Sequence, residues 1–209
     1  RNQTRAWLGQ PWLTWYDRIL CSSQTSIEAV AAVYPGPVSL LPIGVDPELF
    51  NLRGRPEDRA GVVSTVNQWG RERELYWSLD QTTPLAFPLA VFGERRGMSQ
   101  AMSAHARGPV SFFALPSLYN ESRVVLDDFN HTTADYGNVN SRVFEASACG
   151  APVITNRVQG LGDVGLDDLG AADGDRVAID GDRQFGAGQA DERIVDHAGD
   201  HAGVVSRFD

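Results

Sequence analysis

Short apolar runs alternate with polar, turn-rich segments along the first 160 residues of the chain. Apolar runs of this length between turn signals are typical of buried strands. On this basis we predict strands at residues 18–21, 38–41, 61–66, 86–92, 110–113, 123–126 and 152–155. Apolar positions at helical spacing predict helices at residues 25–34, 71–79, 115–122 and 141–148. This alternation predicts an α/β fold with a Rossmann-like parallel sheet.

The helix predicted at residues 141–148 carries the most candidate chemistry. Asn140 is a favourable N-cap, because its side-chain oxygen can accept a hydrogen bond from a first-turn amide. Ser141 and Glu145 are four residues apart, so they share one face of the helix. Gly150 stands where a left-handed residue would end the helix. Such a helix start fits a phosphate and a ribose, but an ordinary solvated helix fits the same spacing equally well.

Two changes of composition divide the chain into three parts. Residues 42–60 are rich in Pro, Gly and polar residues, and Asp46 is placed to cap the turn that follows Pro47. We therefore interpret this segment as a junction between two domains. The linker after residue 50 is predicted to be irregular.

The last part, residues 162–209, is rich in Gly, Asp and Ala, and only residues 176–179 suggest a strand. Its composition is typical of a poorly packed or disordered tail. Two other interpretations of this part stay open: it is a native tail, or it comes from a coding sequence read out of frame. Residues 160–209 hold 12 acidic and 4 basic residues, so most of the net charge of −9 lies in this part.

Composition narrows the class of protein. No apolar run approaches the ~18 residues that a membrane helix requires. Cys21 and Cys149 match no metal or redox spacing, so we expect reduced cysteines in a cytoplasmic protein. All 18 basic residues are arginine, so any phosphate-binding cation must be an arginine. Residues 1–159 are close to neutral, which argues against nucleic-acid binding through a basic surface.

A series of segments supports a family resemblance because they occur together and in one order. They lie at residues 1–2, 7–23, 42–50, 68–73, 118–120, 125–137 and 140–156. Over residues 1–161 the chain resembles GT-B glycosyltransferases of group 1, and most closely their CgeB-like (spore maturation protein) branch. The resemblance does not include the tail.

This resemblance implies that residues 46–161 are the Rossmann-like, C-terminal half of a GT-B fold and that residues 1–45 are the end of its N-terminal domain. Such a fragment would bind a nucleotide-diphosphate sugar, and the full protein would transfer the glycosyl group to an acceptor hydroxyl. The residues expected at the donor are Glu145 at the ribose, Asn140, Ser141 and Arg142 at the diphosphate, Arg71 or Arg73 at the phosphates, and His131 or Thr132 at the sugar.

Two departures from the group 1 pattern bear on the site. Gly137 stands where many of these enzymes have a second glutamate. Val66 stands where a glycine is expected after the first strand of the domain, which would narrow the room for phosphate. The acceptor, whether glycan, lipid or protein, and the catalytic residues stay open, because the acceptor side belongs to the N-terminal domain.

Several alternatives stay open. Asp127 and Asp128 could suggest a metal pair, but adjacent carboxylates at a strand end point in different directions, so we expect them to organise a loop. We expect no metal and no cofactor, and the absence of Gly-x-Gly-x-x-Gly argues against a dinucleotide enzyme. A peripheral membrane contact is compatible with the sequence. The alternative function is a non-catalytic GT-B-like binding protein or a structural protein of the spore or envelope.

Overall fold

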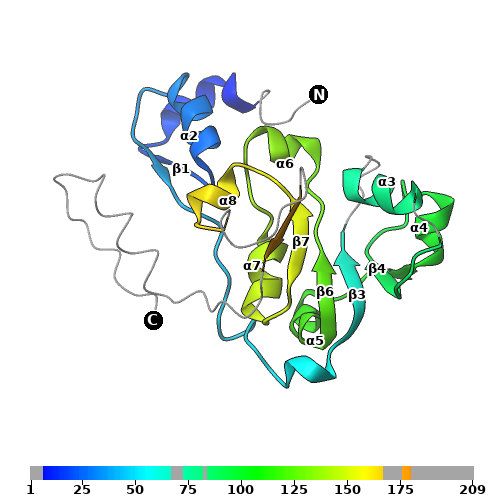
Figure 1. The fold of residues 1–209 in the computed structure, drawn as a ribbon. Coiled ribbons are helices and arrows are strands. Elements are labelled where there is room, and N and C mark those ends of the chain that lie inside the picture. The colour runs from blue at the N-terminus through cyan, green and yellow to red at the C-terminus, as the bar shows by residue number, and fades with distance from the viewer. Residues whose placement is uncertain (1–6, 67–72, 82–83, 167–175, 180–209) are drawn as a thin grey trace.

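A six-stranded sheet forms the centre of the molecule, in the order β5-β4-β3-β6-β7-β8 (Figure 1). The computed structural model describes residues 7–66, 73–81, 84–166 and 176–179. The first five strands are parallel, and β8 runs antiparallel to β7. The predicted Rossmann-like parallel sheet is therefore confirmed. The strands are β3 (Ala60–Thr65), β4 (Leu89–Phe92), β5 (Ala106–Gly108), β6 (Ser122–Leu126), β7 (Val153–Asn156) and β8 (Arg176–Ile179).

Helices cover both faces of this sheet because its strand residues alternate between two apolar cores. On β6, Val125 packs into the core that includes α5 (Leu115–Glu121) and α7 (Ser141–Ala148). Its neighbours Val124 and Leu126 pack into the core that includes α3 (Glu74–Gln81) and α4 (Gln100–Ala104). The central strands are thus buried from both sides.

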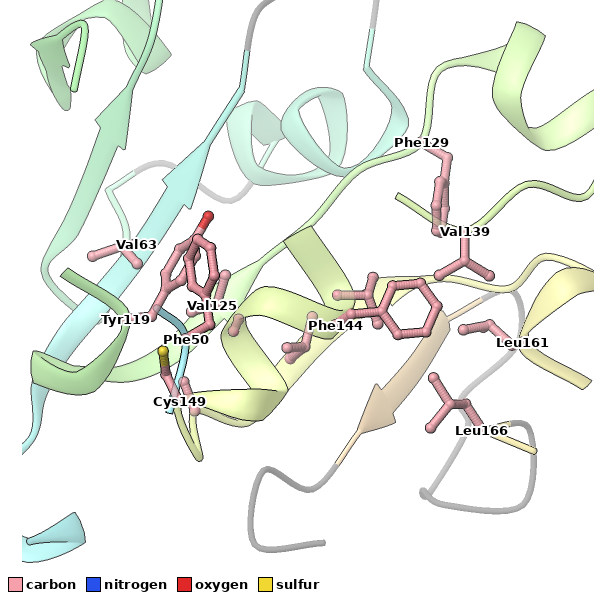
Figure 2. Packing of buried hydrophobic residues seen from close by; sticks show 14 of the residues in the cluster. Phe50, Val63, Tyr119, Val125, Phe129, Val139, Phe144, Cys149, Leu161 and Leu166 are labelled. Carbon is pink, nitrogen blue, oxygen red and sulfur yellow. The ribbon is translucent and has the colours of Figure 1, made fainter. Parts of the chain in front are cut away.

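The core on the α7 side also holds the segment that enters the domain. Figure 2 shows Phe50 beside Tyr119, and their ring centroids are 6.4 Å apart. As predicted, Asp46 caps its turn, accepting a hydrogen bond from the Glu48 amide at 2.9 Å. The Asn120 side chain accepts from the Arg53 amide and donates to the Asn51 carbonyl. Residues 46–53 are therefore anchored to the domain that they precede.

The N-terminal part forms a small layer with its own core. Strands β1 (Ile19–Cys21) and β2 (Val38–Leu40) pair in parallel, and α2 (Gln24–Ala31) and η1 (Pro11–Trp15) complete the layer. Figure 1 shows it next to α6 (His131–Asp135) and α8 (Gly160–Asp163). The core contains Leu13, Ile19, Cys21, Val30 and Tyr34.

Hydroxyl groups at the start of α2 join this layer to the rest of the chain. Ser22 donates to the Asn138 side-chain oxygen at 2.8 Å, and Ser26 donates to the same oxygen at 3.2 Å. Ser23 is fully buried and donates to the Tyr136 carbonyl at 2.5 Å. We call these five residues, 22, 23, 26, 136 and 138, the serine clasp.

Two sequence predictions were wrong. Residues 110–113 form no strand: residues 112–114 are a 3-10 helix, η3 (Phe112–Ala114), and Phe113 is 78% exposed, which a buried strand residue cannot be. The edge strand is instead β5, a few residues earlier, where no strand was predicted. Residues 129–138, where no helix was predicted, contain α6, because Asn130 caps a short helix by accepting from the Thr133 amide.

The tail is partly ordered into the domain. Leu161 and Leu166 are each 1% exposed and belong to the α7-side core, so packing continues past residue 161. The strand suggested at residues 176–179 is β8, and its partner is β7. Residues 180–209 lie outside the described residues. A further short helix, η2 (Pro56–Asp58), precedes β3. No helix in the described part of the chain has the length and apolar character to cross a membrane.

Candidate functional site

The candidate site lies where the chain order of the sheet reverses, between β3 and β6. From β3 the chain moves outward through β4 to β5, and from β6 it moves the other way to β7. In open parallel sheets, ligands bind beyond the carboxyl ends of the strands at this switch point. Thr65 ends β3, and Asp127 follows β6 directly. Polar side chains from both ends meet there.

Asp127 is the centre of these contacts. It is fully buried, and its carboxylate accepts hydrogen bonds from Asn140 Nδ2, at 3.1 Å to each oxygen, and from Thr155 Oγ1 at 3.2 Å. It also forms an ion pair with Arg142. A buried carboxylate needs this many donors to offset the loss of water. We call Thr65, Tyr119, Asp127, Asn140 and Arg142 the switch-point cluster.

Arg142 reaches this cluster from the first turn of α7. Its Nε donates to Thr65 Oγ1 at 2.8 Å, and Thr65 Oγ1 lies 2.8 Å from the Tyr119 hydroxyl. Burial is the largest single influence and disfavours the arginine's charge, but Asp127, Tyr119 and Tyr76 together outweigh it, so the pKa of Arg142 is raised. Burial raises the pKa of Tyr119 to about 12. The guanidinium is therefore charged and Tyr119 neutral at physiological pH. The ion-pair partner of Arg142 is thus Asp127, which follows the neighbouring strand β6.

Asp128 faces a different helix from its neighbour, as expected for adjacent carboxylates. Its Oδ2 accepts from the Leu75 amide at 2.7 Å at the start of α3, while Oδ1 has no hydrogen-bond partner. Burial raises the pKa of Asp128 to about 6, although the Leu75 amide and the charge of Arg73 oppose this. The contact of Asp128 agrees with the expected organising role, whereas Asp127 is bound within the switch-point cluster.

Arg73 was a candidate phosphate contact, and the structure places it inside the protein. It is 7% exposed and donates to the backbone carbonyl of Asp128. Burial lowers the pKa of Arg73, with the Asp128 carboxylate opposing the effect. The arginine thus helps to hold the end of β6 against the start of α3.

Asn140 occupies the predicted N-cap position of α7, but the prediction of its hydrogen bond was wrong. Its side chain makes no capping bond within the helix, because its amide group is bound to Asp127. Asn130, the same residue at the start of α6, does cap its helix. The first-turn amides of α7 consequently have no side-chain cap, unlike those of α6.

Glu145 and Ser141 share one helix face, as their spacing predicted, and their side chains are hydrogen-bonded. Glu145 is 9% exposed, so the interpretation of a solvated surface glutamate was wrong. Burial raises the pKa of Glu145, while Ser141 and then Arg142 oppose the shift. A glutamate held this far from water, close to the switch-point cluster, is a candidate binding group.

The structure describes the other predicted residues only in part. His131 is exposed at the start of α6. Thr132 lies in α6, but its side chain is outside the described residues, and so is Arg71 altogether. Val66 is 4% exposed and packs into the α3-side core. Within the described residues, no group of three or more His, Cys, Asp or Glu could hold a metal ion.

Sequence reasoning missed Thr65 and Tyr119 as members of the site. Thr65 is the last residue of a strand, which is where switch-point side chains come from. The position of Thr65 at a strand end could therefore have indicated it as a site residue. The sequence held no such signal for Tyr119, because its hydroxyl contact depends on how α5 lies against β3.

The strand order and the position of the cluster define a Rossmann-like domain with a switch-point site. Residues 71–173 match a family model described as glycosyl transferase-like. The match extends 12 residues beyond residue 161, where the resemblance in the sequence had ended. No curated protein matches the chain.

A solved structure shows which fold the domain belongs to. The chain is similar to sucrose-phosphate synthase from Thermosynechococcus elongatus, with a TM-score of 0.53 and 17% sequence identity. The alignment covers 78% of this chain and 46% of that chain, so the chain spans about half the length of that structure. The domain therefore has the Rossmann-like architecture of a GT-B domain, as the sequence predicted.

Proposed function

We propose that this chain is the donor-binding half of a glycosyltransferase and that it binds a nucleotide-diphosphate sugar at the carboxyl ends of β3 and β6. The observation that carries the proposal is the position of α7 within the glycosyl transferase-like region. The helix brings Ser141, Arg142 and the buried Glu145 to the switch point. We also propose that the chain belongs to the CgeB-like branch of these enzymes.

Each group has a role that suits its chemistry. The Glu145 carboxylate accepts hydrogen bonds from the ribose hydroxyls, and Ser141 holds its orientation. The diphosphate is bound by the uncapped first-turn amides of α7 and by the Arg142 guanidinium, because a helix N-terminus attracts an anion. The remaining proposed contacts are Arg71, in preference to the buried Arg73, at the phosphates, and His131 or Thr132 at the sugar.

In the full protein the bond between the anomeric carbon and the diphosphate oxygen breaks, and the acceptor oxygen forms the new bond and loses its proton. The diphosphate leaves with an additional negative charge. The positive end of α7 and the Arg142 guanidinium stabilise this charge, which is the usual electrostatic contribution to such a reaction. The acceptor hydroxyl belongs to a glycan, lipid or protein.

Calorimetry with UDP-, ADP- and GDP-sugars tests the proposal. We expect one nucleotide series to bind and Glu145→Gln to weaken its affinity about tenfold or more, since the substitution removes a charged acceptor for two hydroxyls. Glu28→Ala, which alters an exposed glutamate of α2, serves as the matched control. Absence of binding to the unaltered chain by any of these sugars would contradict the proposal.

A second candidate is a non-catalytic GT-B-like binding or structural protein. The observation in its favour is Gly137, at the position of a second glutamate in many group 1 enzymes. This glycine has φ +65°, and a Cβ added to it would lie 3.0 Å from Thr25 Oγ1, so a larger side chain here would be strained and would displace Thr25. Sugar binding without transfer by the full protein to any acceptor tested would favour this candidate.

A further inference from the structure

The guanidinium of Arg142 is held on two of its three nitrogen atoms. Nε donates to Thr65 Oγ1, and Nη1 pairs with the Asp127 carboxylate. These contacts come from the ends of two neighbouring strands, β3 and β6. An arginine held at two points has a fixed guanidinium plane, because its donors form a rigid fork.

The groups that hold Arg142 are themselves fixed. Thr65 is 7% exposed, and its hydroxyl lies 2.8 Å from the hydroxyl of Tyr119, which is fully buried. Asp127 is fully buried and also accepts a hydrogen bond from Thr155, on β7. The arginine therefore rests against the sheet and not against mobile surface groups.

The third nitrogen of Arg142 is directed elsewhere. Nη2 has no hydrogen-bond partner among the described residues, and it is not one of their buried unpaired atoms. The side chain as a whole is 19% exposed. Nη2 is consequently the part of the guanidinium that meets solvent, and it has unused N–H donors.

We propose that Thr65 and Asp127 are positioning residues that orient Arg142, so that its free Nη2 edge meets the diphosphate of the donor. Tyr119 supports this arrangement through Thr65. The inference rests on the proposed function for the identity of the ligand. Donors that are oriented before the ligand arrives bind an anion more strongly than mobile donors, because less freedom is lost on binding.

The first test needs no ligand. NMR relaxation of the Arg142 Nε–H group in the whole chain measures the motion of the guanidinium, and Arg142→Lys identifies its signal. We expect an ordered group in the unaltered protein and a mobile one in Thr65→Val, which changes little but the hydroxyl. Thr14→Val, at an exposed threonine that bonds only the Pro11 carbonyl, is the matched control. An Arg142 that stays rigid in Thr65→Val would overturn the proposal.

The second test measures whether Thr65 acts on binding through Arg142. UDP, ADP and GDP are compared with uridine, adenosine and guanosine, so that the contribution of the diphosphate is isolated. We expect Thr65→Val to weaken binding of the preferred nucleoside diphosphate roughly fivefold, which is the usual net contribution of one hydrogen bond. Binding of the matching nucleoside should not change. In an Arg142→Ala background the same substitution should have no further effect.

The outcomes separate the two proposals. A fivefold loss that persists in the Arg142→Ala background overturns the positioning role but leaves the donor site in place. If the unaltered chain binds no nucleoside diphosphate, the proposed function is overturned, and so is the positioning role of Thr65 and Asp127. Should Thr65→Val fail to fold, Tyr119→Phe replaces it, because this variant removes only the hydroxyl behind Thr65.

Discussion

Two polar networks lie on either side of the entry to α7, and they are built from different chemistry. The switch-point cluster contains the charges of Asp127 and Arg142, and it is almost closed to solvent. The serine clasp, only a few residues earlier along the chain, consists of neutral hydroxyl, amide and carbonyl groups. If one partner is lost, the first network is left with an unpaired buried charge, whereas the second is left with an unpaired neutral group.

This difference suggests a division of labour. The cluster joins strands and helices of one domain, so its charges lie within a single packed unit. The clasp joins the N-terminal layer to the Rossmann-like domain, and interfaces between domains are typically more polar than domain cores. We therefore expect changes in the cluster to affect stability more than changes in the clasp, and the predictions follow in that order.

The largest effect should come from Asp127→Ala. It leaves the Arg142 charge and the donors of Asn140 and Thr155 without their acceptor. Removing one partner of a buried ion pair costs roughly 3–5 kcal/mol, and we expect about 3 because Arg142 keeps some contact with water. Urea denaturation measures the free energy of unfolding. Asp58→Ala, on the exposed η2, should change it by less than about 0.5 kcal/mol. If the two variants change the free energy of unfolding equally, the contacts of Asp127 do not stabilise the fold.

Asp128, which is next to the switch-point cluster in the sequence, should make the stability of the protein depend on pH. Its pKa rises from the model-compound value of 3.8 to about 6 in the folded protein, chiefly through burial. The folded state then binds its proton more tightly than the unfolded state, so the contribution is fully present below pH 4. It is lost as the pH rises through 6, and it amounts to at most about 3 kcal/mol.

Asp128→Asn should remove this pH dependence. Asparagine keeps an oxygen for the Leu75 amide but carries no charge, so we expect the variant to be more stable than the unaltered protein at pH 7.5 and similar to it at pH 4. Urea denaturation at both pH values provides the measurement. Glu145→Gln should give a change in the same direction, because the pKa of Glu145 is also raised. A variant that is less stable at pH 7.5 would show that the charge of Asp128 stabilises the fold.

The two networks also differ in how far the sequence predicted them. The parallel sheet, the helix at residues 141–148 and the left-handed Gly150 followed from local periodicity and residue type, and φ at Gly150 is +72°. The burial of Glu145 and the diversion of Asn140 to Asp127 depend on how α7 lies on the sheet. No local pattern contains that information, since Asn130 and Asn140 are equally good caps by sequence.

The same reasoning explains the incorrect strand at residues 110–113. Its aromatic residues satisfy the local criterion for a buried strand, but Phe112 packs on Phe50, a residue 62 positions earlier, at a centroid distance of 5.5 Å. The actual edge strand β5 is three residues long and includes an exposed arginine, so it has almost no apolar signal. Long-range contacts decided both cases.

On the clasp side, the largest effect should come from Gly160→Ala. A Cβ added at this glycine would lie 2.0 Å from the Gly137 carbonyl oxygen, and neither backbone can retreat without disturbing the clasp. Overpacking of this kind typically costs about 1–3 kcal/mol. Gly44→Ala is the matched control, because nothing lies within 4 Å of its added Cβ. Urea denaturation of both variants should show a loss only for Gly160→Ala, and equal stabilities would mean that residues 137 and 160 are not in close contact in solution.

The smallest effect should come from a single hydroxyl of the clasp. Ser22→Ala removes one donor to the Asn138 side-chain oxygen, which keeps its second donor, Ser26. We expect a loss of about 0.5–1 kcal/mol, since a neutral hydrogen bond contributes little when its acceptor remains paired. A double-mutant cycle with Asn138→Ala isolates the pair, and the coupling energy should lie in the same range. Thr14→Ala, which removes an exposed hydroxyl within the same layer, should cost less. A coupling above about 2 kcal/mol would place the clasp in the same class as the charged cluster, and the division between the two networks would then fail.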